Sequence, residues 1–166
     1  MIIRHEIELD AEAISAVTKA AFANHPISNQ TEHFIIHALR AAGVLAVSLV
    51  AEVGGEVVGH IAFSPVTLSD GSRSWYGLGP VSVLPARQRR GIGTALVQKG
   101  LALLKARRAE GVILVGDPHF YERFGFRSPR ELSHEGVPPE NLLALPFGPD
   151  MPQGVVQFHS AFAATE

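Results

Sequence analysis

The sequence predicts a mixed α/β (α+β) fold, in which a mixed central sheet of about six to seven strands is flanked by about four helices, in a single domain over residues 1–166. Three observations lead to this prediction. Apolar residues recur at helical spacing in the ranges 10–22, 32–42 and 91–110. Between residues 44 and 84, apolar and β-branched runs alternate with tight turn signals, as in antiparallel strands. The length of 166 residues suits one domain, and no repeat, low-complexity tract or linker divides it.

The N-terminal third is predicted to hold one strand and two helices. Ile2–Ile7 is expected to form the strand. Asp10 is placed to cap the first helix, because a short side-chain oxygen accepts a hydrogen bond from an unpaired helix amide. Asn29 and Glu32 match a capping box at the start of the second helix, with Asn in the place of Ser or Thr. Gly43 is a suitable residue to end that helix.

The middle of the chain is predicted to form an antiparallel meander. Its strands are expected at Val44–Val53, Glu56–Leu68 and about Ser74–Leu84. A Gly-Gly pair separates the first two strands and an Asp-Gly pair separates the last two, and both pairs favour hairpin turns. Pro65 lies inside the second strand and has no amide hydrogen, so a bulge or local break is expected there.

The C-terminal half is predicted to begin with the longest helix. Gly91–Glu110 has a continuous apolar face, and Gly111 is expected to close the helix. Val112–Val115 is wholly apolar, as in a strand that is covered on both faces. Asp117-Pro118 can start a short helix, with proline at the first helical position. Two more strands are expected in the proline- and glycine-rich remainder, at Leu142–Phe147 and Val155–Phe162.

Composition excludes several classes of partner. The formal net charge is −2, from 14 basic and 16 acidic residues, so no general attraction to nucleic acid or to an anionic membrane is expected. The most apolar region, residues 41–53, is too short to span a bilayer. The N-terminus lacks the apolar stretch of a signal peptide. We therefore expect a cytoplasmic protein that binds neither nucleic acid nor membrane.

Metal and thiol chemistry are not expected. The chain has no cysteine, which excludes disulfides, a thiolate nucleophile and cysteine-ligated zinc. His33 and His37 are four residues apart and could share one helical face. The zinc-peptidase motif, however, requires Glu where Phe34 stands, and no third ligand is evident. No metal site is predicted.

An anion-binding turn is predicted between the strand that ends near Leu84 and the helix that begins near Gly91. The first amides of a helix have no partner within the helix, and the helix dipole adds partial positive charge to them. Two nearby glycines let an anion approach the backbone, and a cluster of arginines raises the local positive potential. Leu96 replaces the third glycine of a dinucleotide fingerprint, and no Walker-type Gly-Lys-Ser/Thr is present. The turn therefore suits a pyrophosphate other than those of NAD or a hydrolysed ATP.

The same segment resembles the GNAT superfamily of acetyl-coenzyme A dependent N-acetyltransferases. The family signature Gln/Arg-x-x-Gly-x-Gly/Ala is matched by Gln88-Arg89-Arg90-Gly91-Ile92-Gly93. The match also lies in the family's place, after a strand that ends Val81-Ser82-Val83 and before the long helix. The order of elements over residues 1–126 is similar to the family throughout, and the bacterial YhbS-type branch is the most similar one. The resemblance implies the GNAT fold and acetyl-coenzyme A as cosubstrate.

The resemblance also implies roles for individual residues. The backbone of Val81, Ser82 and Val83 would pair with the pantetheine arm, and an amide near Val83 would polarise the thioester carbonyl. The pyrophosphate would be held by the turn and the first helical residues, which are Gln88, Arg89, Arg90, Gly91, Ile92, Gly93 and Thr94. The alternative is a solvated basic turn before an ordinary helix.

Tyr121 is the predicted general acid. It lies in Asp117-Pro118-His119-Phe120-Tyr121-Glu122-Arg123-Phe124-Gly125-Phe126, which resembles the family's Tyr-Glu-x-x-Gly-Phe block, where tyrosine protonates the departing thiolate. A phenol with a pKa of about 10 is protonated at neutral pH and can donate to sulfur. The alternative is a packing role beside Phe120 and Phe124. The family's Asn near the end of the preceding strand is replaced by Asp117, so the resemblance does not extend to a side-chain contact with pantetheine at this position.

The general base stays open between three candidates. Glu32 would lie near the family's acceptor pocket, where a carboxylate could deprotonate or attract an amine, although it also fits the capping box. His60 in the long strand could face the cleft, or it could simply be packed. A relay of water molecules could replace both.

The leading hypothesis is an enzyme that transfers acetyl from coenzyme A to a primary amine by direct attack in a ternary complex. The alternative is a silent acyl-coenzyme A sensor, which would keep the turn at residues 88–93 without needing Tyr121. The acceptor is expected to be a small-molecule or peptide amine, recognised by the loops Asn24–Gln30 and Gly148–Gly154. The resemblance also makes a homodimer an expectation.

Overall fold

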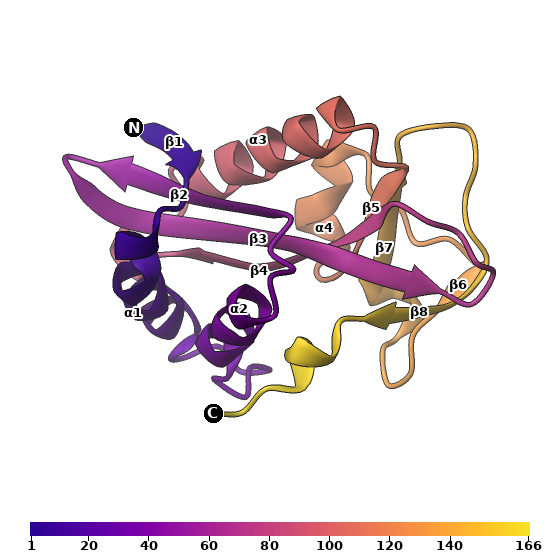
Figure 1. The fold of residues 1–166 in the computed structure, drawn as a ribbon, viewed down its shortest axis with the longest axis horizontal. Helices are drawn as coiled ribbons and strands as arrows, with labels where there is room; N and C mark the ends of the chain where they lie inside the picture. The colour runs from indigo at the N-terminus through magenta and orange to yellow at the C-terminus, as the bar shows by residue number, and fades with distance from the viewer.

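Six strands follow one another across the sheet in the order β1-β2-β3-β4-β5-β7, and two short strands extend it (Figure 1). The computed structural model describes residues 1–166. β1, β2, β3 and β4 are antiparallel to one another in succession, β5 is parallel to β4, and β7 is antiparallel to β5, so the predicted mixed sheet is confirmed. The strands are β1 (Ile2–His5), β2 (Val47–Val53), β3 (Glu56–Leu68), β4 (Trp75–Val83), β5 (Gly111–Val115), β6 (Leu132–Ser133), β7 (Leu142–Pro146) and β8 (Gly154–Phe158).

Helices cover both faces of the sheet. Figure 1 shows α1 and α2 on one side of the strands and α3 on the other. On the first side, Ile14 of α1 and Ile36 of α2 pack on Val50 of β2. On the other side, α3 packs so closely on the sheet that a Cβ at Gly100 would overlap the ring of Phe63. No helix combines the length and the apolar character needed to cross a bilayer. The four helices are α1 (Ala11–Phe22), α2 (Glu32–Ala41), α3 (Ile92–Ala106) and α4 (Pro118–Tyr121).

The predicted meander is confirmed, and its hairpin turn has the expected backbone. Gly54 and Gly55 have φ values of 58° and 81°, as a tight turn between β2 and β3 requires. The bulge or break in β3 that was predicted at Pro65 does not occur at that residue. The pairing of β3 with β4 shifts between Ile61 and Phe63, and Pro65 stays in register with β4. On its other side, β3 pairs with β2 as far as Phe63 and with β8 from Val66, so the missing proline amide falls between two partners.

Two predicted helix caps differ in the structure. α1 begins directly after Asp10, as predicted, but the Asp10 carboxylate accepts hydrogen bonds from Arg4 at 2.7 and 3.0 Å and from the Ile7 amide at 2.7 Å. The predicted capping box is wrong. α2 begins at Glu32, which makes this residue the first of the helix, and its carboxylate accepts from the Ser28 hydroxyl at 2.7 Å.

The chain also departs from prediction after α3 and at the C-terminus. α3 ends at Ala106 rather than Glu110, because Arg108 has a φ of 62° and turns the chain toward β5. Gly111 therefore begins β5 and does not close the helix. β8 ends at Phe158 and is followed by a 3-10 turn, Ser160–Ala163, where strand was predicted. β6, which pairs with β8, was not predicted at all.

Candidate active site

The sheet opens between β4 and β5. The two parallel strands are paired from Trp75 and Gly111 to Gly77 and Ile113, and no pairing between them continues beyond that point. The register between β4 and β3 shifts close to the same place, after Ile61. A bulge of this kind bends its strand. The remainder of β4 therefore has a strand on one edge only, and its other edge is free to pair with an extended ligand.

The ladder between β3 and β4 determines which groups face this open edge. The amide of Leu84 donates to the carbonyl of Val58 at 2.9 Å, and His60 stands opposite Ser82 in the same register. In an antiparallel ladder, bonded and non-bonded pairs alternate. The backbone of Ser82 therefore turns toward β3, whereas the backbone groups of Val81 and Val83 turn toward the open edge. The Gln88 side chain confirms this direction, because its Nε2 donates to the Val83 carbonyl at 3.0 Å.

The turn after β4 presents a row of backbone amides without protein acceptors. The amides of residues 89–94 make no hydrogen bond to the backbone or to a side chain of the protein. The first amide of α3 that has a partner is that of Ala95, which donates to the carbonyl of Gly91 at 3.0 Å. Together with the dipole of a helix of 15 residues, this row suits an anion with several acceptor oxygens.

The two glycines of the turn have different structural roles. Gly91 has a φ of 82° and precedes the helix in the left-handed conformation, which strains any residue with a Cβ. Gly93 has no such conformation. A Cβ there would lie 3.8 Å from a methyl of Val83 and 3.9 Å from the ring of Phe120, which is ordinary contact. Gly93 is thus the point where the end of β4, the start of α3 and the short helix α4 meet.

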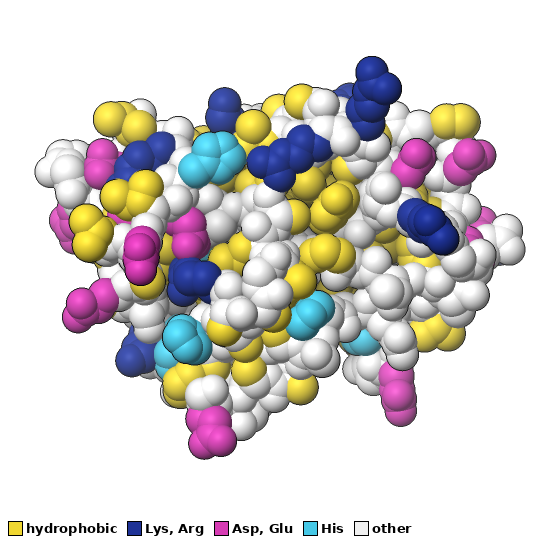
Figure 2. Space-filling view, in the orientation of Figure 1, with side chains coloured by type: hydrophobic (Ala, Val, Ile, Leu, Met, Phe, Trp, Pro, Cys, Tyr) yellow, Lys and Arg dark blue, Asp and Glu magenta, His cyan; other side chains and the backbone are white.

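Positive side chains surround the turn without carboxylate partners. Arg89 and Arg90 are exposed, Arg87 is half-buried, and none of the three takes part in an ion pair within the protein. The visible face in Figure 2 carries side chains of both signs rather than a broad field of one. Since the net charge of the whole chain is −2, the positive charge at this turn is local, and no carboxylate of the protein neutralises it.

Tyr121 lies on α4 with its ring inside the core. The side chain is 8% exposed, and the ring packs edge-on against Phe120 and Phe126. Gly116 makes room for it, since a Cβ there would come within 2.7 Å of the Tyr121 ring. Burial, reinforced by the charge of Asp117, raises the pKa of Tyr121 to about 12. The phenol is therefore protonated at neutral pH, as a proton donor must be.

Asp117 has a structural function that explains the start of α4. Its Oδ1 accepts a hydrogen bond from the His119 amide at 2.9 Å, and Pro118 occupies the first helical position. The predicted short helix is confirmed, and it is followed by a 3-10 turn that ends at Gly125. With its carboxylate engaged as a cap, Asp117 orients the segment that carries Tyr121.

Glu32 lies at the other candidate position, the start of α2. Besides its contact with Ser28, it is tied to the loop before it, because the Ser28 hydroxyl oxygen also accepts from the Gln30 amide at 2.8 Å. The loop itself is largely exposed, with Ile27 85% accessible. Glu32 therefore holds the loop that is expected to meet the acceptor.

A buried polar cluster under α1 and α2 was not predicted as a unit. Its members are Glu6, Ser48 and His60, and the side chain of His60 is fully buried. Ser48 Oγ lies 2.7 Å from His60 Nε2 and donates to Glu6. Arg40 of α2 binds Glu6 at 2.8 and 3.0 Å. Burial works to raise the pKa of Glu6, but the facing His60, Arg40 and Ser48 hold it well below its ordinary value.

One atom of this cluster lacks a partner. His60 Nδ1 is buried and makes no hydrogen bond. A buried polar atom left in this way costs about 1–3 kcal/mol. The sequence signal for the cluster was the presence of polar residues in otherwise apolar strands, but the contacts join segments 42 residues apart.

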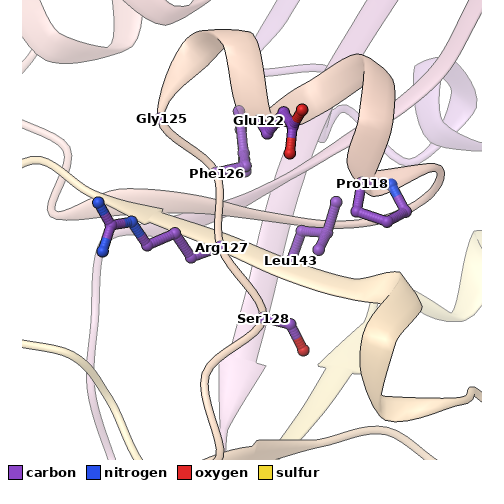
Figure 3. Close-up of a pocket in the computed structure, with 7 residues that line it drawn as sticks. All are labelled: Pro118, Glu122, Gly125, Phe126, Arg127, Ser128 and Leu143. Carbon is purple, nitrogen blue, oxygen red and sulfur yellow. The ribbon is translucent and has the colours of Figure 1, made fainter.

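A hollow of about 490 Å³ lies beside α4, on the side of β5 where β7 runs (Figure 3). It is lined by Pro118, Glu122, Gly125, Phe126, Arg127, Ser128 and Leu143. None of these residues belongs to β4 or to the turn before α3, so the hollow is separate from the open edge. No group of three or more His, Cys, Asp or Glu side chains is placed to hold a metal ion.

Comparisons with known proteins agree with this geometry. Residues 12–126 match the family model of the acetyltransferase (GNAT) family. A relative from Escherichia coli K12, named uncharacterized N-acetyltransferase YhbS, is 36% identical over 127 residues, which cover 76% of this chain and 73% of the relative.

Two solved structures are similar over nearly the whole chain. One is a GNAT family acetyltransferase from Brucella melitensis in complex with acetyl-CoA, with a TM-score of 0.87, 51% identity and coverage of 97% of each chain. The other is Escherichia coli YhbS in complex with CoA, with a TM-score of 0.89, 29% identity and coverage of 99% of this chain and 93% of that one.

Proposed function

This chain belongs to the acetyltransferase (GNAT) family, and from that premise we propose that it transfers acetyl from acetyl-coenzyme A to a primary amine by direct attack in a ternary complex. The observation that carries the proposal is the row of unpaired amides over residues 89–94, placed directly beyond the open edge of β4. A diphosphate on these amides would put the coenzyme's pantetheine arm within reach of that edge.

Binding would use two parts of the open edge. The diphosphate accepts hydrogen bonds from the amides of the turn, and Arg89 and Arg90 add positive charge. The pantetheine amides pair with the outward backbone groups of Val81 and Val83, as an added strand would. Ser82 does not offer its backbone in this way, because it is opposite His60 in the ladder.

Transfer would follow from this placement. The neutral amine attacks the thioester carbonyl, and an outward amide of β4, near Val83, stabilises the oxygen on which negative charge develops. Collapse of the intermediate breaks the carbon–sulfur bond and releases a thiolate, and the attacking nitrogen loses its extra proton to solvent to give the neutral amide. Tyr121 gives its hydroxyl proton to that sulfur and is later reprotonated from solvent. Its hydroxyl has no hydrogen-bonding partner in the protein that would compete for this donation.

Glu32 would act at the entrance for the acceptor. Its carboxylate stands at the start of α2, beside the exposed loop over residues 24–30. Negative charge there attracts a protonated amine, and the same carboxylate is a candidate to remove its proton. The acceptor class supported by this arrangement is a cationic primary amine, on a small molecule or on a peptide.

A thiol-release assay tests the proposal. The protein is supplied with acetyl-coenzyme A and a panel of primary amines, comprising a polyamine, an aminoglycoside, a peptide with a free N-terminus and an N-blocked peptide with one lysine. We expect free thiol and acetylated amine to appear together, at a one-to-one ratio, for at least one class. Coenzyme binding without thiol release across the whole panel would instead support a sensor that does not turn over.

A further inference from the structure

The buried polar cluster continues across the sheet toward the open edge of β4. His60 of β3 is directly opposite Ser82 of β4, so their side chains share the face that α1 and α2 cover. The Ser82 hydroxyl donates a long hydrogen bond of 3.4 Å to Thr18 Oγ1 of α1, weak enough for the hydroxyl to turn toward another acceptor. Ser82 itself stands between Val81 and Val83, whose backbone groups face the open edge.

The hydrogen bonds of the cluster determine the tautomer of His60. Glu6 is ionised and can only accept, so the single hydroxyl proton of Ser48 is donated to it. Ser48 Oγ must then accept its bond from His60, which places a proton on His60 Nε2. In a neutral imidazole the other nitrogen carries a lone pair. His60 Nδ1 is therefore an unprotonated acceptor, and it is the buried atom that has no partner.

The surroundings favour a neutral His60 that can accept one proton. Burial, which outweighs the attraction of Glu6, lowers the pKa of His60. Glu6 Oε1 lies 3.7 Å from His60 Nε2 and stabilises the positive charge of an imidazolium, whereas the positive charge of Arg40 destabilises it. Asp10 is the other charged group that acts on the ring. The neighbouring faces of α1, β2 and β4 present the neutral side chains Thr18, Ser48 and Ser82.

We propose that His60 takes up the proton of the acceptor ammonium through the Ser82 hydroxyl or a water beside it, and that Ser48 and Glu6 hold it in the receptive tautomer. The step balances as one proton transferred. An N–H bond of the ammonium breaks, Ser82 or the water receives that proton and passes its own on, and an N–H bond forms at His60 Nδ1. This inference rests on the proposed function, because the amine must approach the acyl group at the open edge. Acting through another group, His60 is a positioning residue in the relay.

The kinetic test is the pH dependence of kcat for the amine that is acetylated fastest in the panel. In the unmodified protein we expect kcat to fall as pH drops through a value below about 6.5, the ordinary pKa of histidine. His60→Gln keeps a donor near the position of Nε2 but removes the lone pair of Nδ1. This variant should lower kcat at pH 7.5 by about 10²-fold or more. It should also abolish the fall of kcat at low pH, which is the acid limb of the pH profile.

Glu6→Gln separates a relay from a purely structural role. Without the carboxylate, the imidazolium is less stable, so the acid limb should move to lower pH while His60 remains in place. Glu56→Gln, at an exposed carboxylate in the hairpin between β2 and β3, serves as the control and should leave the position of the limb unchanged. Coenzyme affinity, measured by calorimetry, should stay within a few-fold of the unmodified value in all three variants.

A spectroscopic measurement on the unmodified protein needs no variant to fold. Nitrogen-15 NMR of the His60 ring should show a proton on Nε2 and none on Nδ1 at pH 7.5. A protonated Nδ1, or a His60→Gln variant with the original kcat and acid limb, would overturn the relay while leaving the transferase function intact. Loss of the limb in Glu32→Gln alone would transfer the role of base to Glu32. No turnover by the unmodified protein with any amine would instead remove the proposed function itself.

Discussion

Alanine at Gly91 and alanine at Gly93 should change the stability of the protein in opposite directions. At Gly91 an added Cβ meets no atom within 4 Å, so the penalty comes only from the left-handed backbone with its φ of 82°. That conformation costs a residue with a Cβ about 1–2 kcal/mol. At Gly93 the backbone has no such strain, and the Cβ makes ordinary contacts with Val83 and Phe120. Alanine there should gain up to about 1 kcal/mol of helix propensity.

The same strain limits the effect on coenzyme binding. If the Gly91→Ala variant keeps the left-handed turn, its free energy of unfolding falls by the full 1–2 kcal/mol and its affinity is preserved. If the turn relaxes in the free protein, binding must restore it, and 1–2 kcal/mol then corresponds to a roughly 5- to 30-fold weaker Kd. Gly93→Ala should bind within a few-fold of the unmodified protein, because its Cβ fits beside Val83 and Phe120.

Urea unfolding without ligand and calorimetry with coenzyme A measure the two quantities. The sum of the losses in unfolding and binding free energy for Gly91→Ala should be about 1–2 kcal/mol, however it is divided. A Gly91→Ala variant unchanged in both measurements would refute the role of this conformation in the turn. So would a Gly93→Ala variant that is the more damaged of the pair.

Three further predictions concern the proton donor Tyr121, the half-buried ion pair of Glu6 with Arg40, and the arginines of the turn before α3. Tyr121→Phe should lower kcat by about 10²–10⁴-fold with nearly unchanged coenzyme affinity. The ratio of its kcat to that of the unmodified protein should stay constant from about pH 7 to 10, because the pKa of Tyr121 is raised to about 12. A titrating ratio would contradict the assignment. Because the pKa of Glu6 is lowered, its ionised carboxylate stabilises the fold fully at pH values above the unfolded pKa of about 4.3, and this stabilisation is lost as the pH falls. In Glu6→Gln the free energy of unfolding, measured in urea, should therefore decrease less as the pH is lowered. Identical declines would exclude this contribution. Replacing Arg89 and Arg90 by alanine should weaken coenzyme binding several-fold at about 50 mM salt and less at about 500 mM, whereas Arg73→Ala should have no effect.

Local sequence signals predicted the parts of the fold that depend on neighbouring residues. The Gly54-Gly55 turn, the Asp117 start of α4 and the long helix after Gly91 are all determined within a few residues. The extent of α3 was overestimated because its apolar pattern continues past the left-handed Arg108. β6 was missed because it has only two residues and exists through its pairing with β8.

In the candidate site, too, residues that are adjacent in the sequence could be predicted, whereas residues that the fold brings together could not. The turn from Gln88 to Gly93 carries its chemistry in consecutive residues, and it was therefore visible in the sequence. The cluster of Glu6, Ser48 and His60 is assembled by the sheet from three separate segments, and no spacing in the sequence marks it. Glu32 shows a third case. Its position at the start of α2 was predicted, but its partner Ser28 was decided by a loop conformation that propensities do not determine.

Diphosphate binding at the turn before α3 is tested by a calorimetric titration of the unmodified protein with coenzyme A, acetyl-coenzyme A and pantetheine, which lacks the diphosphate. If the amides of residues 89–94 hold that group, both coenzymes should bind and pantetheine should bind far more weakly. Equal affinity for pantetheine, or no heat with either coenzyme, would show that these amides do not hold the diphosphate.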